Sequence, residues 1–266
     1  MIEAFKKLYA PFILGFGIYD KIKLFWLTFF FTFKRRFGLI AENSGSAIRN
    51  QVQIKFGGNF FDFYPVDGSD LSVLREIFIE KQYDTKLRDI TPEIIFDIGS
   101  NVGASIIYFK LKYPRAKIYA FEPDPENFQR LKENIRQFDN IQVRNFAISD
   151  TNGPVVFFIH PQSAMSSSLK KRQSRQKKIT VNSKTLGQAM EDEGIDQIDL
   201  VKFDVEGAEF DIFFAPSSLP KIKCFLGEVH EDIAGKTVEN FLALFPGRTV
   251  WQKKQTMKKR YIVELS

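Results

Sequence analysis

The chain has 266 residues, enough for one α/β domain with an appendage, and its 44% hydrophobic and 26% charged residues are ordinary for a folded soluble protein. Its single cysteine, Cys224, excludes an intramolecular disulfide, and no cluster of cysteine and histidine suggests structural zinc. The absence of cysteine pairs fits a reducing compartment, so we expect a cytoplasmic protein.

The net charge of +6 is unevenly distributed. Residues 170–178 carry six cations in nine positions, and residues 34–36 and 253–260 form two further basic patches. Such blocks attract phosphate-rich partners. Because the basic segments lack interleaved aromatic residues that could stack on bases, no specific nucleic-acid partner is expected. An anionic membrane surface or a charged glycan or lipid is at least as good a partner.

An aromatic segment lies near the start of the chain, where residues 24–33 form a ten-residue apolar run flanked by lysine and arginine. A membrane-spanning helix needs about 20 apolar residues, and the segment lacks the small-residue cleavage site of a signal peptide. Two interpretations stay open. The helix lies at a membrane interface, peripherally attached, or it covers an apolar face of the main domain or of a second subunit in an oligomer.

The next segments predict a linker and a small accessory unit. Residues 41–50 are polar, residues 51–64 around Gly57-Gly58 predict a hairpin, and residues 70–81 have helical periodicity. We therefore divide the chain into an N-terminal aromatic and basic helical extension, an accessory hairpin and helix, and the main domain. The three parts cover residues 1–50, 51–91 and 92–266.

Strands and helices alternate through the main domain, as in a doubly wound α/β fold. The expected strands cover residues 94–98, 117–122, 141–149, 153–160, 198–204 and 223–230. The expected helices cover residues 103–112, 125–137, 184–193, 207–214 and 236–245, and residues 248–252 and 260–265 predict a terminal hairpin. In such open sheets, ligands bind outside the carboxyl ends of the strands.

The first of these strands ends in a glycine turn that opens a helix, Asp97-Ile-Gly99-Ser100-Asn101-Val-Gly103. Gly99 can adopt backbone angles that other residues avoid, and Gly103 lets the helix pack close to the sheet. The first amides of the helix would face an anionic group of a ligand. A buried charge on Asp97 needs a cation or an amide as partner, and a ligand ammonium would serve. The turn therefore predicts a nucleotide-type cofactor site.

Glu122 strengthens this prediction, because it ends the second strand, 25 residues after Asp97, where a carboxylate would bind a ribose diol. In the structural alternative, Asp97 accepts turn amides and Glu122 caps the next helix. NAD and S-adenosylmethionine (SAM) both fit, but the turn lacks the full spacing and the third glycine of a pyrophosphate site, so we favour SAM. We count Pro123 among the cofactor-binding residues, and Ala147, Ser149 and Asp150 would line the adenine.

The motifs occur in the order of a known family. They are Phe96–Gly103, Phe121–Pro123, Asn145–Asp150, the serine cluster Met165–Leu169, Ile198–Glu209 and Gly227–His230, preceded by Asp70–Tyr83. Over about residues 55–231 the chain resembles the FkbM family of SAM-dependent methyltransferases. The resemblance implies a class I (Rossmann-like) fold: a mostly parallel seven-stranded sheet with an antiparallel C-terminal edge hairpin. It also implies O-methylation of a hydroxyl on a sugar, glycolipid or secondary metabolite.

Polar residues at the ends of the later strands are the candidates for chemistry. His230 ends its strand, and its near-neutral pKa makes it the preferred general base for an acceptor hydroxyl, with a structural histidine as the alternative. His160 is less well placed. Asp204 and Glu206 could instead act as base, orient the acceptor or the SAM ammonium, or hold a divalent metal together with Glu209. Metal dependence stays open.

Two other functions stay in view. One is an NAD-linked oxidoreductase on a similar sheet, which the glycine spacing disfavours. The other is a non-catalytic SAM-fold module that binds a membrane or a polyanion through its basic segments. The full set of polar residues expected around the crevice argues against this module.

Overall fold

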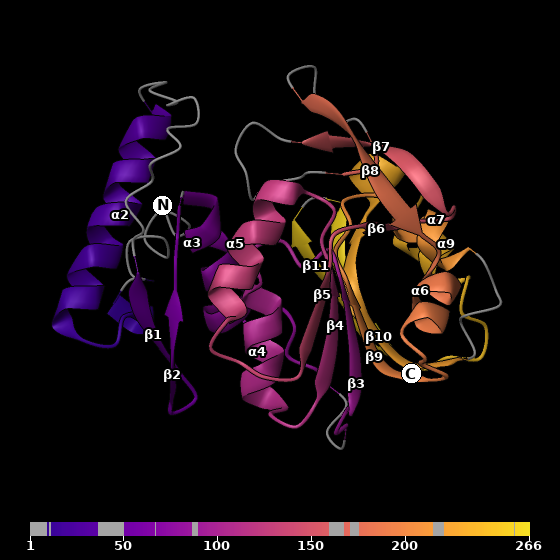
Figure 1. Ribbon diagram of the computed structural model, residues 1–266, viewed down its shortest axis with the longest axis horizontal. Helices are drawn as coiled ribbons and strands as arrows, with labels where there is room; N and C mark the ends of the chain where they lie inside the picture. The colour runs from indigo at the N-terminus through magenta and orange to yellow at the C-terminus, as the bar shows by residue number, and fades with distance from the viewer. Residues whose placement is uncertain are drawn as a thin grey trace.

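A computed structural model describes residues 10, 12–36, 51–66, 68–86, 90–159, 168–170, 176–214, 221–257 and 259–266. Its centre is a seven-stranded sheet of order β11-β12-β10-β9-β3-β4-β5 (Figure 1). The strands are β3 (Ile94–Ile98), β4 (Lys117–Phe121), β5 (Ile141–Arg144), β9 (Ile198–Phe203), β10 (Ile222–His230), β11 (Val250–Met257) and β12 (Arg260–Leu265). Strands β10, β9, β3, β4 and β5 pair in parallel, and β12 is antiparallel to both neighbours. The predicted sheet and its C-terminal edge hairpin are confirmed.

Helices cover both faces of this sheet (Figure 1). One face carries α4 (Ala104–Lys112) and α5 (Pro125–Ile135), and the other carries α6 (Leu186–Asp192), α7 (Glu209–Phe213) and α9 (Val238–Leu242). A short helix, α8 (Glu231–Ala234), follows β10. Successive side chains of a strand point to opposite faces, so Ile95 enters the core under α4 and Phe96 the core under α7, both with 0% exposure. This explains the unbroken apolar run of the strand.

A second, three-stranded sheet has the order β6-β8-β7, with β6 (Ala147–Ile148), β7 (Gly153–Ile159) and β8 (Lys177–Lys184). It corrects two expectations. The strand expected over 141–149 is two short strands in different sheets, because β6 pairs with β8. Lys177 and Lys178 belong to a strand, because Ile179 and Val181 alternate with polar residues and pack into an apolar cluster. Residues 160–167 and 171–175, with His160 and most of the serine cluster and basic segment, lie outside the described residues.

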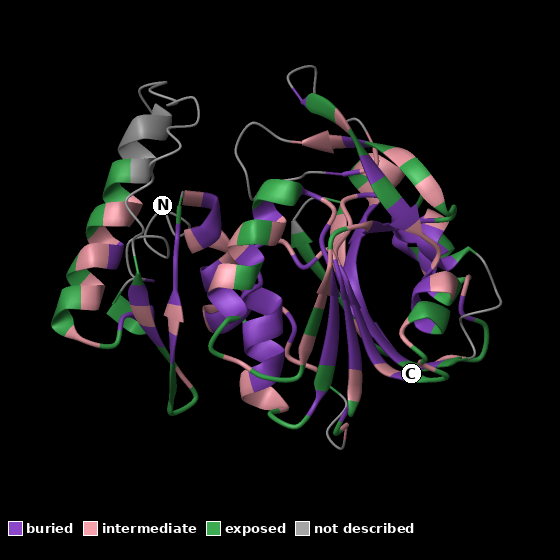
Figure 2. Cartoon of the chain, in the orientation of Figure 1, coloured by how far each residue is buried: buried purple, intermediate pink, exposed green. Residues whose placement is uncertain are grey.

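The N-terminal part contains α2 (Ile18–Arg36), the hairpin β1 (Val52–Phe56) and β2 (Asn59–Phe63), α3 (Gly68–Leu74) and a π-helix, η1 (Arg75–Ile79). The predicted hairpin and helices are present, and α2 extends beyond the apolar run. Leu24 and Ile54 belong to the same buried cluster as Ile107 of α4, so the extension shares a core with the main domain. The outer side of α2 is exposed, whereas the central strands are buried (Figure 2). Within the described ranges, no helix combines the length and apolar character needed to cross a membrane.

Candidate functional site

The glycine turn after β3 is fixed by close backbone packing. Gly99 has φ +76°, and a Cβ there would lie 2.0 Å from the carbonyl oxygen of Asp204, so a larger residue does not fit. The Gly99 amide donates to the Phe121 carbonyl at 3.0 Å, which ties the turn to β4. Gly103 caps α4 with φ +89°, and its close contact is Ile135 of α5. Gly103 therefore allows packing between two helices and not, as expected, between helix and sheet.

Glu122 follows β4 and holds the turn from the other side. Its Oε2 accepts from the Asn101 amide at 2.8 Å and its Oε1 from the Asp124 amide at 2.9 Å. Burial raises the pKa of Glu122 to about 8. The helix-capping role of the structural alternative belongs to Asp124, whose side chain accepts from the Glu126 amide at the start of α5. When Glu122 is ionised, each of its oxygens keeps a further lone pair for a ligand hydroxyl.

Asp97 has a partner within the chain. Its Oδ1 lies 2.9 Å from Lys202 Nζ, its Oδ2 accepts from Ser105 Oγ at 2.5 Å, and the side chain has 0% exposure. Lys202 also donates to the Gly99 carbonyl at 2.7 Å, and Ser100 Oγ donates to the Asp97 carbonyl at 2.8 Å. The expected contact between Asp97 and a ligand ammonium is thus replaced by a buried ion pair, because Lys202 on β9 supplies the cation. Asp97 and Ser100 therefore stabilise the turn through contacts within the protein and do not line the cavity.

A cavity of about 500 Å³ opens where β3, β4, β9 and β10 end. Seven of the predicted site residues line it: Gly99, Asn101, Glu122, Pro123, Ala147, Asp204 and Glu206. The others lie outside its lining. Ser149 is buried and donates to the Thr151 carbonyl at 2.9 Å, and Asp150 is exposed.

Sequence reasoning missed several residues of the cavity wall: Arg75, Glu76, Asn127, Phe157, Glu228, Lys254 and Arg260. The sequence pattern could have identified two of these residues. Strand alternation puts Glu228 on the same side of β10 as His230, and the terminal hairpin places Arg260 opposite His230.

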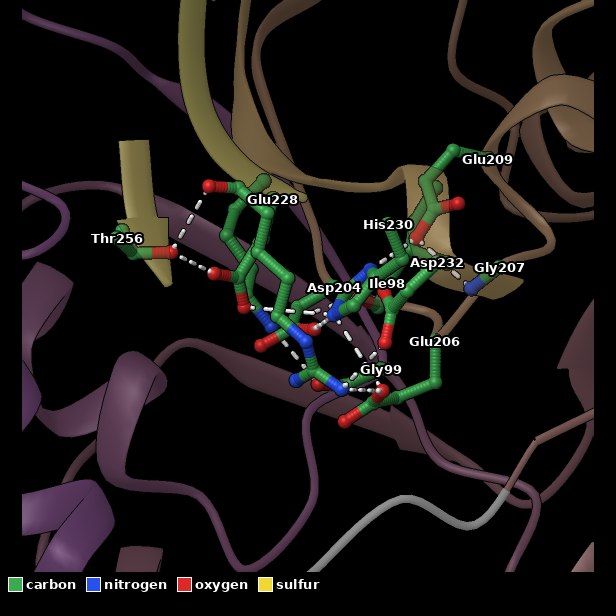
Figure 3. Close-up of polar contacts among 12 residues, drawn as sticks. Ile98, Gly99, Asp204, Glu206, Gly207, Glu209, Glu228, His230, Asp232 and Thr256 are labelled. Atoms are coloured by element: carbon green, nitrogen blue, oxygen red, sulfur yellow. Dashed lines mark hydrogen bonds and ion pairs between the residues drawn. The ribbon is translucent and has the colours of Figure 1, made fainter. Parts of the chain in front are cut away.

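His230 lies among four carboxylates, and Figure 3 shows Glu209 on one side of the ring and the others on the opposite side. Its Nδ1 is 2.6 Å from Glu209 Oε1. Its Nε2 is 3.3 Å from Glu206 Oε2, 3.4 Å from Glu228 Oε2 and 3.8 Å from Asp204 Oδ1. Glu209 also accepts from the Gly207 amide at 3.0 Å.

This environment changes the chemistry expected of His230. Burial lowers the pKa of the imidazole, but the charges of Glu206 and Glu209 outweigh burial and hold the pKa well above its ordinary value. The near-neutral pKa on which the general-base prediction rested is therefore absent. Burial, assisted by the charge of Glu228, raises the pKa of Asp204 to about 6, and Tyr83 Oη donates to Asp204 Oδ2 at 3.1 Å.

The comparisons with known proteins agree with this arrangement. A family model described as the methyltransferase FkbM domain matches residues 97–245. The 2-O-methyltransferase NoeI of Sinorhizobium fredii is 31% identical over 136 residues, which cover 45% of this chain and 55% of NoeI. The hexuronic acid methyltransferase AglP of Haloferax volcanii is 26% identical over 207 residues, covering 77% of this chain and 80% of AglP. The chain spans 55% to 66% of the length of three curated relatives, NoeI among them.

Among solved structures, the Methanococcus jannaschii fibrillarin pre-rRNA processing protein superposes with a TM-score of 0.50 at 11% identity, covering 84% of this chain and 85% of that chain. This likeness concerns the fold alone and agrees with the expected class I architecture. The family model covers more than half of the chain, from Asp97 in β3 to Phe245 beyond α9. The chain therefore belongs to the FkbM methyltransferase domain family.

Proposed function

We propose that the protein is a SAM-dependent O-methyltransferase that acts on a hydroxyl of a sugar, a glycolipid or a secondary metabolite. The observation that carries the proposal is the single cavity that joins Glu122 and the glycine turn to the carboxylates Asp204 and Glu206. A cofactor would occupy the first end and an acceptor hydroxyl the second. The relatives NoeI and AglP, named as methyltransferases of a 2-hydroxyl and of a hexuronic acid, support this choice.

The cofactor end has features that fit SAM. The glycine turn lines the cavity at Gly99 and Asn101, and Glu122 offers acceptor oxygens to a ribose diol. Asn101 and Asn127 add polar groups to the same wall. When bound, SAM would supply a methyl group on a sulfonium, which is a good leaving group.

The acceptor end of the cavity would position the acceptor hydroxyl and provide a group that takes its proton. The chain must hold the hydroxyl oxygen close to the methyl group and remove the hydroxyl proton as the oxygen–carbon bond forms. Asp204 and Glu206 both line the cavity and present carboxylate oxygens there. Arg75, Lys254 and Arg260 line it as well, and this polar wall favours a hydroxylated or acidic acceptor over an apolar one.

Calorimetry with SAM and with S-adenosylhomocysteine tests the cofactor, and a methyl-transfer screen over glycans and glycolipids with mass detection tests the acceptor. We expect both nucleosides to bind and at least one glycan to gain 14 mass units per methyl group. If NADH but not S-adenosylhomocysteine raised the melting temperature, the oxidoreductase alternative would replace this proposal.

We also propose that the protein is cytoplasmic and attaches peripherally to anionic membranes through α2 and the hairpin beside it. Large apolar side chains are exposed on α2, on the residues just before it and on β2: Phe12, Ile13, Phe16, Ile18, Tyr19, Ile22, Trp26, Phe29, Phe30 and Phe60. Exposed apolar patches of this kind mark interaction sites, and the neighbouring Lys21 and Lys23 favour an anionic surface.

A vesicle-sedimentation assay tests this second proposal. We expect salt-sensitive binding to anionic vesicles and weak binding to neutral ones, and the double variant Trp26→Ser, Phe29→Ser should reduce it. The matched control is Trp251→Ser, which changes an exposed tryptophan on β11. If the protein ignored vesicles and formed dimers that the double variant disrupts, α2 would be a subunit interface instead.

A further inference from the structure

We propose that Asp204, Glu228 and His230 form a binding site for a divalent metal ion at the acceptor end of the cavity. Asp204 follows β9 and the other two residues end β10, so adjacent parallel strands bring them together. One ligand atom from each residue lies within 4.8 Å of the other two. The sequence had instead suggested Glu206 and Glu209 as partners of Asp204.

The separations suit coordination after small side-chain movements. His230 Nε2 lies 3.4 Å from Glu228 Oε2 and 3.8 Å from Asp204 Oδ1. Two neighbouring ligands of an octahedral ion at about 2.1 Å are separated by about 3 Å. The third separation, between the Asp204 and Glu228 oxygens, is within 4.8 Å. Side-chain rotations that shorten the first two distances by less than about 1 Å and the third by less than about 2 Å therefore place the three atoms around one ion.

The state of His230 is a second, independent indication of a ligand. The side chain has 0% exposure, and its Nε2 lies 3.3 Å from Glu206 Oε2 and 3.4 Å from Glu228 Oε2 but forms no hydrogen bond with either carboxylate (Figure 3). A buried nitrogen without a hydrogen bond is costly. A metal ion would use the Nε2 lone pair and remove this cost.

Glu209 contacts the other nitrogen of the His230 ring, on the side away from the proposed metal ion. Its Oε1 lies 2.6 Å from His230 Nδ1, and its own side chain has 0% exposure. When Nδ1 donates a proton to a carboxylate, the tautomer is fixed and Nε2 is left as a lone-pair donor. Metal-binding histidines usually have such a carboxylate partner. Glu209 is therefore a positioning residue, and Glu228 is itself held by the hydroxyl of Thr256 at 2.5 Å.

The charge of the group also favours a divalent ion. Four carboxylates surround one imidazole, and the nearby Arg260 Nη2 lies 3.7 Å from Glu206. One arginine and one imidazolium do not balance four carboxylates, whereas a divalent ion in place of the imidazole proton brings the group closer to neutrality. Two carboxylates and one imidazole suit Mg²⁺ or Mn²⁺, which prefer oxygen ligands and accept nitrogen.

The role of this ion rests on the proposed function. Asp204 and Glu228 line the cavity, so the open coordination positions would face the acceptor. The ion would bind the acceptor hydroxyl, lower its pKa and fix its oxygen. As the oxygen–methyl bond forms and the sulfur–methyl bond breaks, the electron pair stays on sulfur and the hydroxyl proton passes to Glu206, which lines the same cavity.

The site is tested by titrating the chelator-treated full chain with Mn²⁺. Calorimetry measures the heat of binding, and electron paramagnetic resonance measures the Mn²⁺ that stays free. We expect one ion per chain and competition by Mg²⁺. Loss of a positioning residue weakens metal binding by about 10–100-fold, so Asp204→Asn and Glu228→Gln should each weaken it at least as much. Both variants keep the side-chain size, and Asp204 is partly exposed, so folding should survive. Thermal melts of both variants show whether they fold.

The matched control is Glu122→Gln, which changes a buried carboxylate in the same cavity without touching the three ligands. It should leave Mn²⁺ binding unchanged while weakening SAM. Absence of Mn²⁺ binding, or binding that neither variant alters, would overturn the metal site. Binding of Mn²⁺ without any affinity for S-adenosylhomocysteine would instead overturn the proposed function and leave the metal site standing.

Discussion

Replacing Glu122 with alanine should weaken SAM binding while the fold survives. The carboxylate is 5% exposed and accepts the Asn101 and Asp124 amides, one on each oxygen. Truncation removes the acceptor for the ribose and leaves two amides without partners at the cavity wall. Each unpaired buried group costs about 1–3 kcal/mol. The two amides lose their partner in the free and in the SAM-bound protein alike, so their cost lowers stability and not affinity. The ribose hydroxyls lose their acceptor only in the complex, so we expect a loss of about 1–3 kcal/mol in binding, which is about 5–150-fold in Kd.

Calorimetry with SAM and S-adenosylhomocysteine measures this loss, and a thermal melt confirms folding. Glu122→Gln keeps one acceptor oxygen and should lose less. Glu126→Gln, an exposed substitution in the first turn of α5, is the matched control and should leave the Kd unchanged. Wild-type affinity in the alanine variant would remove Glu122 from the cofactor site and with it the assignment of this end of the cavity.

Three further predictions concern stability. Gly99→Ala should prevent folding or lower stability by well over the cost of its φ alone, whereas Gly194→Ala, with φ +65° and no atom within 4 Å of the added Cβ, should cost only about 1–2 kcal/mol; equal losses in denaturant titrations would contradict the clash. Lys202→Met should lower the free energy of unfolding by about 3–5 kcal/mol, because it leaves the buried Asp97 carboxylate without a cation. Adding Asp97→Asn should recover part of this loss. No recovery would show that the ion pair is not the cause. The pKa of Glu122 is raised from 4.5 to about 8, so its contribution to stability is present below about pH 4.5 and is lost as the pH rises to 8. Glu122→Gln should therefore lose less stability than the wild type between pH 5 and pH 8, and parallel pH profiles would argue against the shift.

The fold was predictable where the local pattern decides the structure. Buried parallel strands give apolar runs and surface helices give a 3.6-residue period, so β3, α4 and β10 fall within two residues of the predicted bounds. The loop predicted at β8 was wrong, because its lysines resemble a basic loop unless the alternating Ile179 and Val181 are weighed against them. The prediction also joined β5 to β6, because nothing local reveals that β6 pairs with a strand about 35 residues later.

The cofactor end of the site was predictable for the same reason. Gly99 and Glu122 act through backbone geometry at the ends of consecutive strands, and both line the cavity. The partner of Asp97 was not predictable, because Lys202 sits opposite it only through the pairing of β3 with β9, which are more than 90 residues apart in sequence. The requirement for a cation came from the cost of an unpaired buried charge. The residue that supplies this cation is determined by the order of the strands in the sheet.

The acceptor end shows how assembly changes the chemistry of a residue that the sequence located correctly. His230 was expected as an isolated imidazole with an ordinary pKa, and it does stand at the end of β10. Its four carboxylates come from the end of β9, the turn after it, the start of α7 and β10 itself. Together they stabilise the protonated imidazole, which is the opposite of what a general base requires. The same gathering of oxygen atoms around a buried nitrogen suits a divalent ion, so the histidine is better explained as a ligand that fixes the acceptor than as the group that deprotonates it.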